Sequence, residues 1–286
     1  MVSLLLINVN KLSMDYNIVS FLSLLKYNFD SNLISNNIRN EAKILFPELF
    51  SSLSQDDSEY FWNVTQLPDK IPVINYNESE IKLIIEDILI KSNKKLPLPK
   101  KINIIVLPTF YKFFLEELDG VMGYAPTIGG TIFISINTST ENWKKSLQDT
   151  IAHEYHHVII HEYHNWETIG QILIFEGLAE YFRDEIVGGK KSPWIEKINK
   201  EYEKTLISFV PEFANNWNQN AFLEDSQYDA LFMGDEIHPQ WLGYSLGYII
   251  IRDIQEKYKF SWIEITKKEP LEIWQLWLDI KKDKVL

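Results

Sequence analysis

The chain has 286 residues, of which 45% are hydrophobic, so it can bury a sizeable core in one large unit or in two joined ones. Its 40 acidic and 28 basic residues give a formal net charge of −12, which argues against non-specific binding to nucleic acids or to anionic membranes. The sequence has no cysteine, so any metal ion must be bound by nitrogen and oxygen atoms.

The first residues of the chain bear on where the protein is expected to reside. Residues 1–8 contain an apolar run that is far shorter than a membrane span. They also lack the basic segment and the small-residue cleavage site of a secretory signal. We therefore expect cytoplasmic residence and no membrane-spanning segment.

The first 100 residues are expected to form a helical N-terminal region. Scattered apolar positions over residues 11–60 predict several short helices. The prediction is sharper over residues 77–91, because Asn77 and Glu80 resemble a capping box and isoleucines follow with helical spacing. A polar segment interrupted by prolines then indicates a boundary near residue 100.

A small sheet is predicted next, over residues 101–136. Aliphatic and β-branched residues run from Ile102 to Leu107 and stop at Pro108, which is typical of a buried strand. The alternating segment Thr131–Ile136 predicts a second strand, which we place at an edge of the sheet. An edge strand can bind an extended peptide by adding it to the sheet, but an ordinary structural strand is the favoured interpretation.

Five of the six histidines lie within residues 153–164, on a helix predicted to begin near Glu141. Two of them frame a glutamate in the pattern His-Glu-x-x-His. Residues four apart share one face of a helix, so His153 and His157 can direct ring nitrogens toward one metal ion. Glu154 lies beside them, where a carboxylate can accept a proton from a water molecule.

Two histidines do not complete a site, because zinc sites that catalyse hydrolysis usually have three protein ligands. The candidate third ligand is Glu176, nineteen positions after His157. It lies on a second helix predicted over residues 168–187 and ended by Gly188 and Gly189. Apolar residues flank Glu176, so its carboxylate would be buried and would require a metal ion or another partner.

These motifs resemble those of the gluzincin metallopeptidases, and in detail those of the YjaZ-type predicted zinc-dependent peptidases. The shared pattern is His-Glu-x-x-His, eighteen intervening residues and a Glu-Gly-Leu-Ala-Glu segment, within residues 120–255. The resemblance implies a zincin-like α+β fold that is mostly helical, with a small mixed sheet packed on the His-Glu-x-x-His helix and helical N- and C-terminal parts. It also implies one Zn²⁺ ion bound by His153, His157 and Glu176, with Glu154 as the general base.

Two further acids are candidates to orient the first histidine of the motif. In gluzincins, an acid four residues after the glutamate ligand commonly accepts the distal N–H of this histidine, and Glu180 has that offset. Asp149, one helical turn before His153, is the competing candidate. The alternative for Glu180 is an ion pair at the surface with Arg183.

Hydrolysis also requires a hydrogen-bond donor for the oxyanion, which we expect in the helical C-terminal part, residues 190–286. A helix predicted from His238 onward offers three candidates. Tyr244 is preferred, because related zincins often carry a tyrosine followed by a small residue on a helix past the ligands. Tyr248 and His238 are the other two, and packing of aromatic side chains in a core helix is an equally good interpretation of each.

The other histidines of the cluster allow a rival metal site. His157 and His161 also lie one helical turn apart, but the pair has no glutamate placed as a base toward a third ligand. We therefore expect His156, His161 and His164 at the surface, at the helix end or on the substrate side.

Together these residues predict a catalytic region over residues 101–286 that acts as a zinc-dependent peptidase on peptides or proteins. Endopeptidase or oligopeptidase action is favoured, since aminopeptidases with this ligand spacing carry a Gly-x-Met-Glu-Asn segment and residues 121–125 have no glutamate. The alternative is a zinc-stabilised binding or regulatory protein that has the same fold but does not hydrolyse peptides. The sequence predicts neither the natural substrate nor the oligomeric state.

Overall fold

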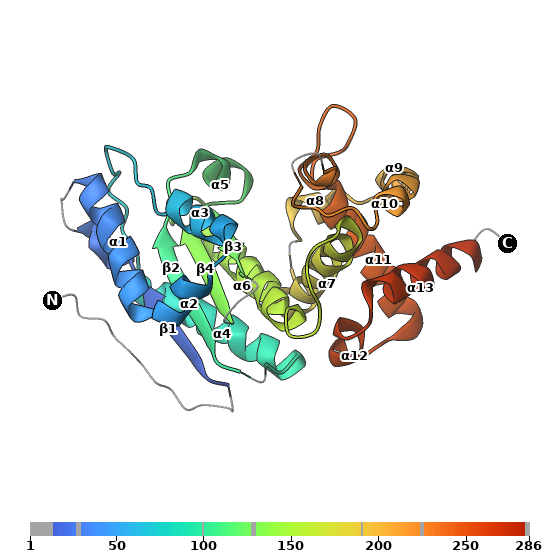
Figure 1. Cartoon of the computed structure of the whole chain (residues 1–286), viewed down its shortest axis with the longest axis horizontal. Helices are drawn as coiled ribbons and strands as arrows, with labels where there is room; N and C mark the ends of the chain where they lie inside the picture. Colours follow the sequence, from blue (N-terminus) through green and yellow to red (C-terminus); the bar gives the residue numbers. More distant parts are fainter. Residues whose placement is uncertain are drawn as a thin grey trace. The chain divides into compact units, whose positions relative to one another are not determined.

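The computed structural model describes residues 14–26, 30–98, 100–126, 130–189, 191–223 and 226–283 (Figure 1). The apolar run at residues 1–8 lies outside this part of the chain. The chain divides into two compact units, Met1–Val158 and Ile159–Leu286. Within the described residues, no helix is long and apolar enough to cross a membrane.

The first unit is built on a four-stranded mixed sheet. Its strands are β1 (Tyr16–Ser20), β2 (Ile102–Pro108), β3 (Val121–Tyr124) and β4 (Thr131–Ile136), in the order β1-β2-β4-β3. β2 pairs in parallel with β1 and with β4, whereas β3 is antiparallel to β4. The strands predicted at Ile102 and Thr131 are therefore confirmed. β1 was not predicted, because its residues lie in a region where only helices were expected.

The predicted position of the Thr131–Ile136 strand is wrong. β4 lies between β2 and β3, and all six of its residues are buried, so it has no free edge. The edge strand on this side of the sheet is β3, which pairs with β4 through Val121 to Tyr124. β3 is only four residues long, with alternating burial and a glycine, and such a short segment gives a weak strand signal in the sequence.

The helices of the first unit surround this sheet. They are the 3-10 helix η1 (Leu22–Lys26), α1 (Ser31–Leu45), α2 (Pro47–Ser52), α3 (Gln55–Val64), α4 (Glu78–Lys95), α5 (Lys112–Glu117) and α6 (Trp143–Ile160), which extends past the unit boundary. The predicted helix at residues 77–91 is confirmed, and the Asn77 side chain accepts a hydrogen bond from the Glu80 N–H at 3.2 Å. The predominance of helices beside a small mixed sheet confirms the expected α+β class.

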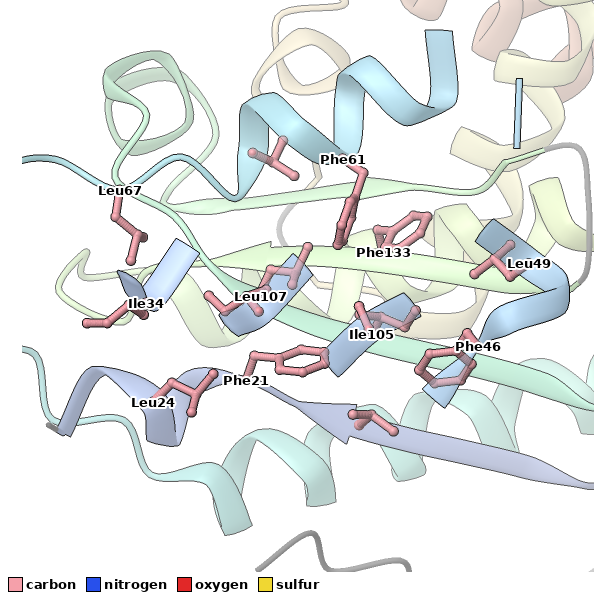
Figure 2. Packing of buried hydrophobic residues seen from close by; sticks show 14 of the residues in the cluster. Phe21, Leu24, Ile34, Phe46, Leu49, Phe61, Leu67, Ile105, Leu107 and Phe133 are labelled. Carbon is pink, nitrogen blue, oxygen red and sulfur yellow. The ribbon is translucent and has the colours of Figure 1, made fainter. Parts of the chain in front are cut away.

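One face of the sheet carries the main apolar cluster of the first unit (Figure 2). Side chains alternate between the two faces of a strand, so Ile105, Leu107 and Phe133 point to the same side. There they pack against residues of α1, α2 and α3, including Phe61, and against Phe46 between α1 and α2. The helix α6 lies against the opposite face, because Gly123 of β3 meets its side chains.

The second unit is entirely helical in its described residues, with one isolated β-bridge. It contains α7 (Ile169–Val187), α8 (Pro193–Glu196), α9 (Lys200–Ser208), α10 (Val210–Asn215), the π-helical turn η2 (Asp229–Met233), α11 (Leu242–Tyr258), α12 (Trp262–Thr266) and α13 (Pro270–Asp283). The prediction for α7 is confirmed, with a capping box between Thr168 and Gln171 and an end at Gly188. α11 begins at Leu242 rather than at His238, after Trp241 in the left-handed region.

Candidate metal and catalytic site

The two histidines of the His-Glu-x-x-His motif turn toward each other on α6. The Nε2 atoms of His153 and His157 lie 2.9 Å apart, and their ring planes are nearly perpendicular. This geometry follows from the helical repeat, which places residues four apart on one face. Two imidazole nitrogens directed to the same place are suited to a shared ligand, provided that both rings are neutral.

Glu176 of α7 completes a set of three donors. One ligand atom from each of His153, His157 and Glu176 can be chosen so that all three lie within 4.8 Å of one another. Two nitrogen donors and one carboxylate oxygen are a set that zinc accepts in hydrolytic sites. The Glu176 side chain is also only 5% exposed and follows the buried Phe175, so burial without a charged or polar partner would be costly. The residues therefore fit a bound zinc ion.

Close packing of two helices fixes the main chain next to Glu176. α7 and α11 approach each other at Gly177 and Gly247, where a Cβ atom on either glycine would collide with the main chain of the other helix. Such close approach requires residues without side chains on both helices. Glu176 is thus carried by a rigid part of the second unit.

The proposed base, Glu154, lies against the edge strand of the sheet in the first unit. Its side chain is 8% exposed. A Cβ atom added at Gly123 would collide with the Cγ atom of Glu154 and with the Cγ2 atom of Thr150, both on α6. The glycine therefore makes room for the side chain of Glu154 between the helix and the strand. The sequence offered no indication of this contact, since it depends on how β3 pairs with β4.

The two acids expected to orient His153 have strong ionic partners. Both oxygens of Asp149 accept hydrogen bonds from Lys145, at 2.6 and 2.7 Å. Glu180 is 2% exposed, and one of its oxygens accepts from Arg183 at 2.8 Å and from Ser192 at 3.0 Å. The ion pair of Glu180 with Arg183 is thus present but buried rather than at the surface. A role of either acid toward His153 stays a prediction.

Tyr248, one of the expected oxyanion donors, uses its hydroxyl group in another contact. It donates to Asp184 at 2.8 Å and accepts from Lys191 at 2.6 Å. Burial raises the pKa of Tyr248. A hydroxyl group has only one proton to donate, and here Asp184 receives it.

His238 is held by two carboxylates. Its Nδ1 atom lies 2.8 Å from Asp235 and its Nε2 atom 3.1 Å from Glu212. Burial alone would lower the pKa of His238, but the hydrogen bonds and charges of Glu212 and Asp235 outweigh it and raise the pKa. Both ring nitrogens are therefore engaged in binding carboxylates within the second unit.

Tyr244 has a partner that the sequence pattern did not reveal. The rings of Tyr228 and Tyr244 both pack against Phe232, at 4.8 and 6.0 Å between centroids, and Tyr228 lies near the charge of Glu176. Burial and this charge raise the pKa of Tyr228, whereas a side-chain interaction with Tyr244 lowers it. Tyr228 immediately precedes the π-helical turn η2 and has no helical apolar stripe around it, so periodicity could not have found it.

The remaining histidines do not share one environment. His156 is completely buried, so its expected placement at the surface, at the helix end or on the substrate side is wrong. Burial and the charges of His157 and His153 lower its pKa well below the ordinary value. The ring of His161 packs against Trp166, and the Nε2 atom of His164 lies 2.9 Å from the Thr266 carbonyl oxygen.

Comparison with known proteins relates this geometry to a family. Residues 81–275 match the family described as "Predicted Zn-dependent protease (DUF2268)". The chain belongs to this family. The match includes all three candidate ligands and Glu154, and it confirms the resemblance to predicted zinc-dependent peptidases that the motifs indicated.

One similar curated protein is itself uncharacterised. The "Uncharacterized protein YjfC" of Bacillus subtilis (strain 168) is 28% identical over 165 residues. The match covers 54% of this chain and 54% of that protein, so this chain spans about half the length of the relative. No solved structure was found to match the chain. The family description therefore supports a protease in general terms, while the substrate and the type of cleavage are left to the chemistry of the site.

Proposed function

We propose that this protein is a zinc-dependent peptidase that hydrolyses peptide bonds in peptides or proteins, as an endopeptidase or oligopeptidase. One observation carries the proposal: ligand atoms of His153, His157 and Glu176 lie within 4.8 Å of one another. Glu154, next to the first histidine, is available as a base. The membership of a family of predicted zinc-dependent proteases supports the same reaction.

Each residue of the site has a chemical role in this proposal. His153, His157 and Glu176 would hold one zinc ion, which would supply a Lewis acid for a carbonyl group and for water. Glu154 accepts a proton from the attacking water and donates it to the leaving amine. The side chain of Glu154 fills the space that a Cβ atom at Gly123 would take, so the strand helps to position this carboxylate for general-base catalysis.

The finer classification follows from the same residues. We propose the gluzincin type, because eighteen residues separate the third ligand, a glutamate, from the motif. We also propose a zincin-like catalytic region over residues 101–286, preceded by the region 1–100. The preference for endopeptidase or oligopeptidase action rests on residues 121–125, which form the edge strand β3 and its continuation without an acidic residue for a free amine. Cytoplasmic residence stays a prediction.

Metal analysis combined with cleavage of a peptide library tests the proposal. The purified full chain should contain one zinc ion and cleave a subset of the peptides, and a chelator followed by added zinc should abolish and restore this cleavage. Products from the middle of long peptides would indicate endopeptidase action, and products released one residue at a time would contradict it. A chain that binds zinc and cleaves no peptide would instead support a binding or regulatory protein.

A further inference from the structure

Tyr155 occupies a variable position of the His-Glu-x-x-His motif, directly after Glu154 on α6. Its side chain is completely buried. The Tyr155 hydroxyl lies 2.8 Å from the Leu96 carbonyl oxygen and 3.1 Å from the Oδ1 atom of Asn93. Asn93 is in the last turn of α4, and Leu96 follows the end of that helix. The motif helix is therefore bonded to the N-terminal helical region at a residue between its two histidines.

The acceptors of the Tyr155 hydroxyl are themselves held in place. The Leu96 N–H donates to the Ser92 carbonyl oxygen at 2.8 Å, which ends α4. Asn93 Oδ1 also accepts from the Leu98 N–H at 2.9 Å, so the segment after the helix is fixed to its last turn. Leu96 is fully buried, and a buried carbonyl group requires a hydrogen-bond donor. Tyr155 thus bonds to main chain that has a defined position.

Glu154 and Tyr155 hold α6 on two different sides. Consecutive residues of an α-helix point about 100° apart around its axis. The Glu154 side chain packs against β3 at Gly123, and the Tyr155 hydroxyl bonds to the end of α4. All of these residues belong to the first unit. The contact at Gly123 limits how closely Glu154 approaches the strand, whereas a hydrogen bond also has a preferred direction and so resists rotation of the helix.

We propose that Tyr155 is a positioning residue of the peptidase, whose bond to the end of α4 fixes the rotation of the motif helix and thereby the position of the Glu154 carboxylate. This assignment rests on the proposed function and adds to it a residue that the motif leaves variable. It also gives α4, and with it the N-terminal helical region, a part in catalysis.

Two variants of the zinc-loaded full chain remove the bond from opposite ends. Tyr155→Phe should lower kcat at least about tenfold and leave KM within about threefold of the parent, since a shift of about 1 Å at a reacting group can lower the rate about 100-fold. Asn93→Ala removes one acceptor without changing α6, and it should lower kcat in the same direction by about threefold.

The matched control for the loss of a buried hydroxyl is Tyr76→Phe. Tyr76 is 5% exposed, belongs to the first unit, and donates its hydroxyl proton to the Ile136 carbonyl oxygen at 3.4 Å. This variant should lower the denaturation midpoint, as Tyr155→Phe does, while its kcat stays close to that of the parent. Denaturant titration shows that every variant is folded under the assay conditions.

A double variant shows whether Tyr155 acts through Glu154. Tyr155→Phe and Gly123→Ala are both expected to displace the same carboxylate, so the loss of kcat in the double variant should be smaller than the product of the two single losses. Tyr76→Phe combined with Gly123→Ala should give the product, because Tyr76 does not act on Glu154. Zinc content is measured on each preparation.

Each other outcome overturns the assignment for a different reason. Equal kcat of Tyr155→Phe and Tyr76→Phe, or parent-like kcat of Asn93→Ala, would mean that the bond only stabilises the fold. Losses that multiply in the double variant with Gly123→Ala would mean that Tyr155 acts on something other than Glu154. A loss of kcat in proportion to lost zinc would assign the effect to the metal ligands. A parent protein that binds zinc but cleaves no peptide would refute the proposed function itself, before any variant is compared.

Discussion

The two carboxylates of the candidate site lie in surroundings that are built in different ways. In the first unit, the side chain of Glu154 packs directly against the main chain of an edge strand at Gly123. In the second unit, the helix that carries Glu176 is fixed through the neighbouring Gly177, which meets the main chain of α11 at Gly247. The strand therefore positions the base by contacting the side chain of Glu154. The proposed ligand Glu176 is positioned instead through the backbone of its helix.

This difference determines what a small substitution should change. A methyl group at Gly123 would displace the side chain of Glu154 while both histidines keep their helix. A methyl group at Gly247 would instead push two main chains apart, which costs stability before it affects chemistry. The effect of a methyl group at Gly123 should therefore appear in turnover, and that of one at Gly247 in stability.

The largest effect is expected for the proposed ligand of the second unit. Glu176→Gln keeps the size of the side chain but removes the charged oxygen donor. Mutating a residue that only hydrogen-bonds to a metal ligand already lowers metal affinity by up to about 100-fold, so loss of a ligand should lower zinc affinity by about 100-fold or more. Competition with a fluorescent chelator measures it. The matched control is Glu185→Gln, an exposed acid on the same helix. Equal zinc affinity of the two variants would remove Glu176 from the site.

Gly123→Ala should affect turnover rather than metal binding. The added methyl group displaces Glu154, and a misplacement of about 1 Å at a reacting group can lower the rate about 100-fold. The zinc content should remain close to that of the parent, and the unfolding free energy should fall by less than in Gly247→Ala, because side chains rather than a second main chain must move. Both are measured on the same preparation. Parent-like turnover would show that the contact with the strand does not position the base.

Gly247→Ala should act on stability. Its Cβ atom would meet the carbonyl oxygen of Leu173 and the backbone of Gly177, and neither can move independently of α7. A loss of about 1–3 kcal/mol in the free energy of unfolding is expected, as for other overpacked positions. Denaturant titration measures this loss. The comparison is Gly243→Ala, whose Cβ atom meets the ring of Phe232 instead of main chain and should cost less. The reverse order would contradict the rigid helix contact.

The smallest effect is a pH dependence of stability that belongs to the second unit alone. The pKa of His238 is raised in the folded protein, so its stabilising contribution is fully present below the ordinary value of 6.5 and is lost as the pH rises through the folded value. The parent should therefore lose more unfolding free energy than His238→Gln when the pH rises through this range. Parallel curves for the two proteins would show that Glu212 and Asp235 do not hold a charged His238.

Features set by local spacing could be predicted from the sequence. The facing Nε2 atoms of His153 and His157 follow from the helical repeat, and the caps at Asn77 and Thr168 follow from their side chains. Features that depend on distant pairing could not. The inner position of β4 required knowledge of β3, and the shared packing of Tyr228 and Tyr244 on Phe232 joins residues of two separate elements.

Glu154 combines both kinds of information. Its role follows from its place in the motif, whereas its packing against Gly123 follows only from the pairing of β3 with β4. Glu176 likewise combines the two: the sequence indicated that it is a buried acid. The close contact of its helix with α11 became evident only in the structure.

The most direct test of the central claim compares the parent with Glu154→Gln on one peptide from the cleavage library. Zinc content is measured on both preparations, and the three proposed ligands are left unchanged. We predict that the variant retains one zinc ion per chain and that its kcat falls by at least about 100-fold, since it has lost the general base. Parent-like cleavage by a zinc-loaded Glu154→Gln variant would contradict the proposed peptidase mechanism.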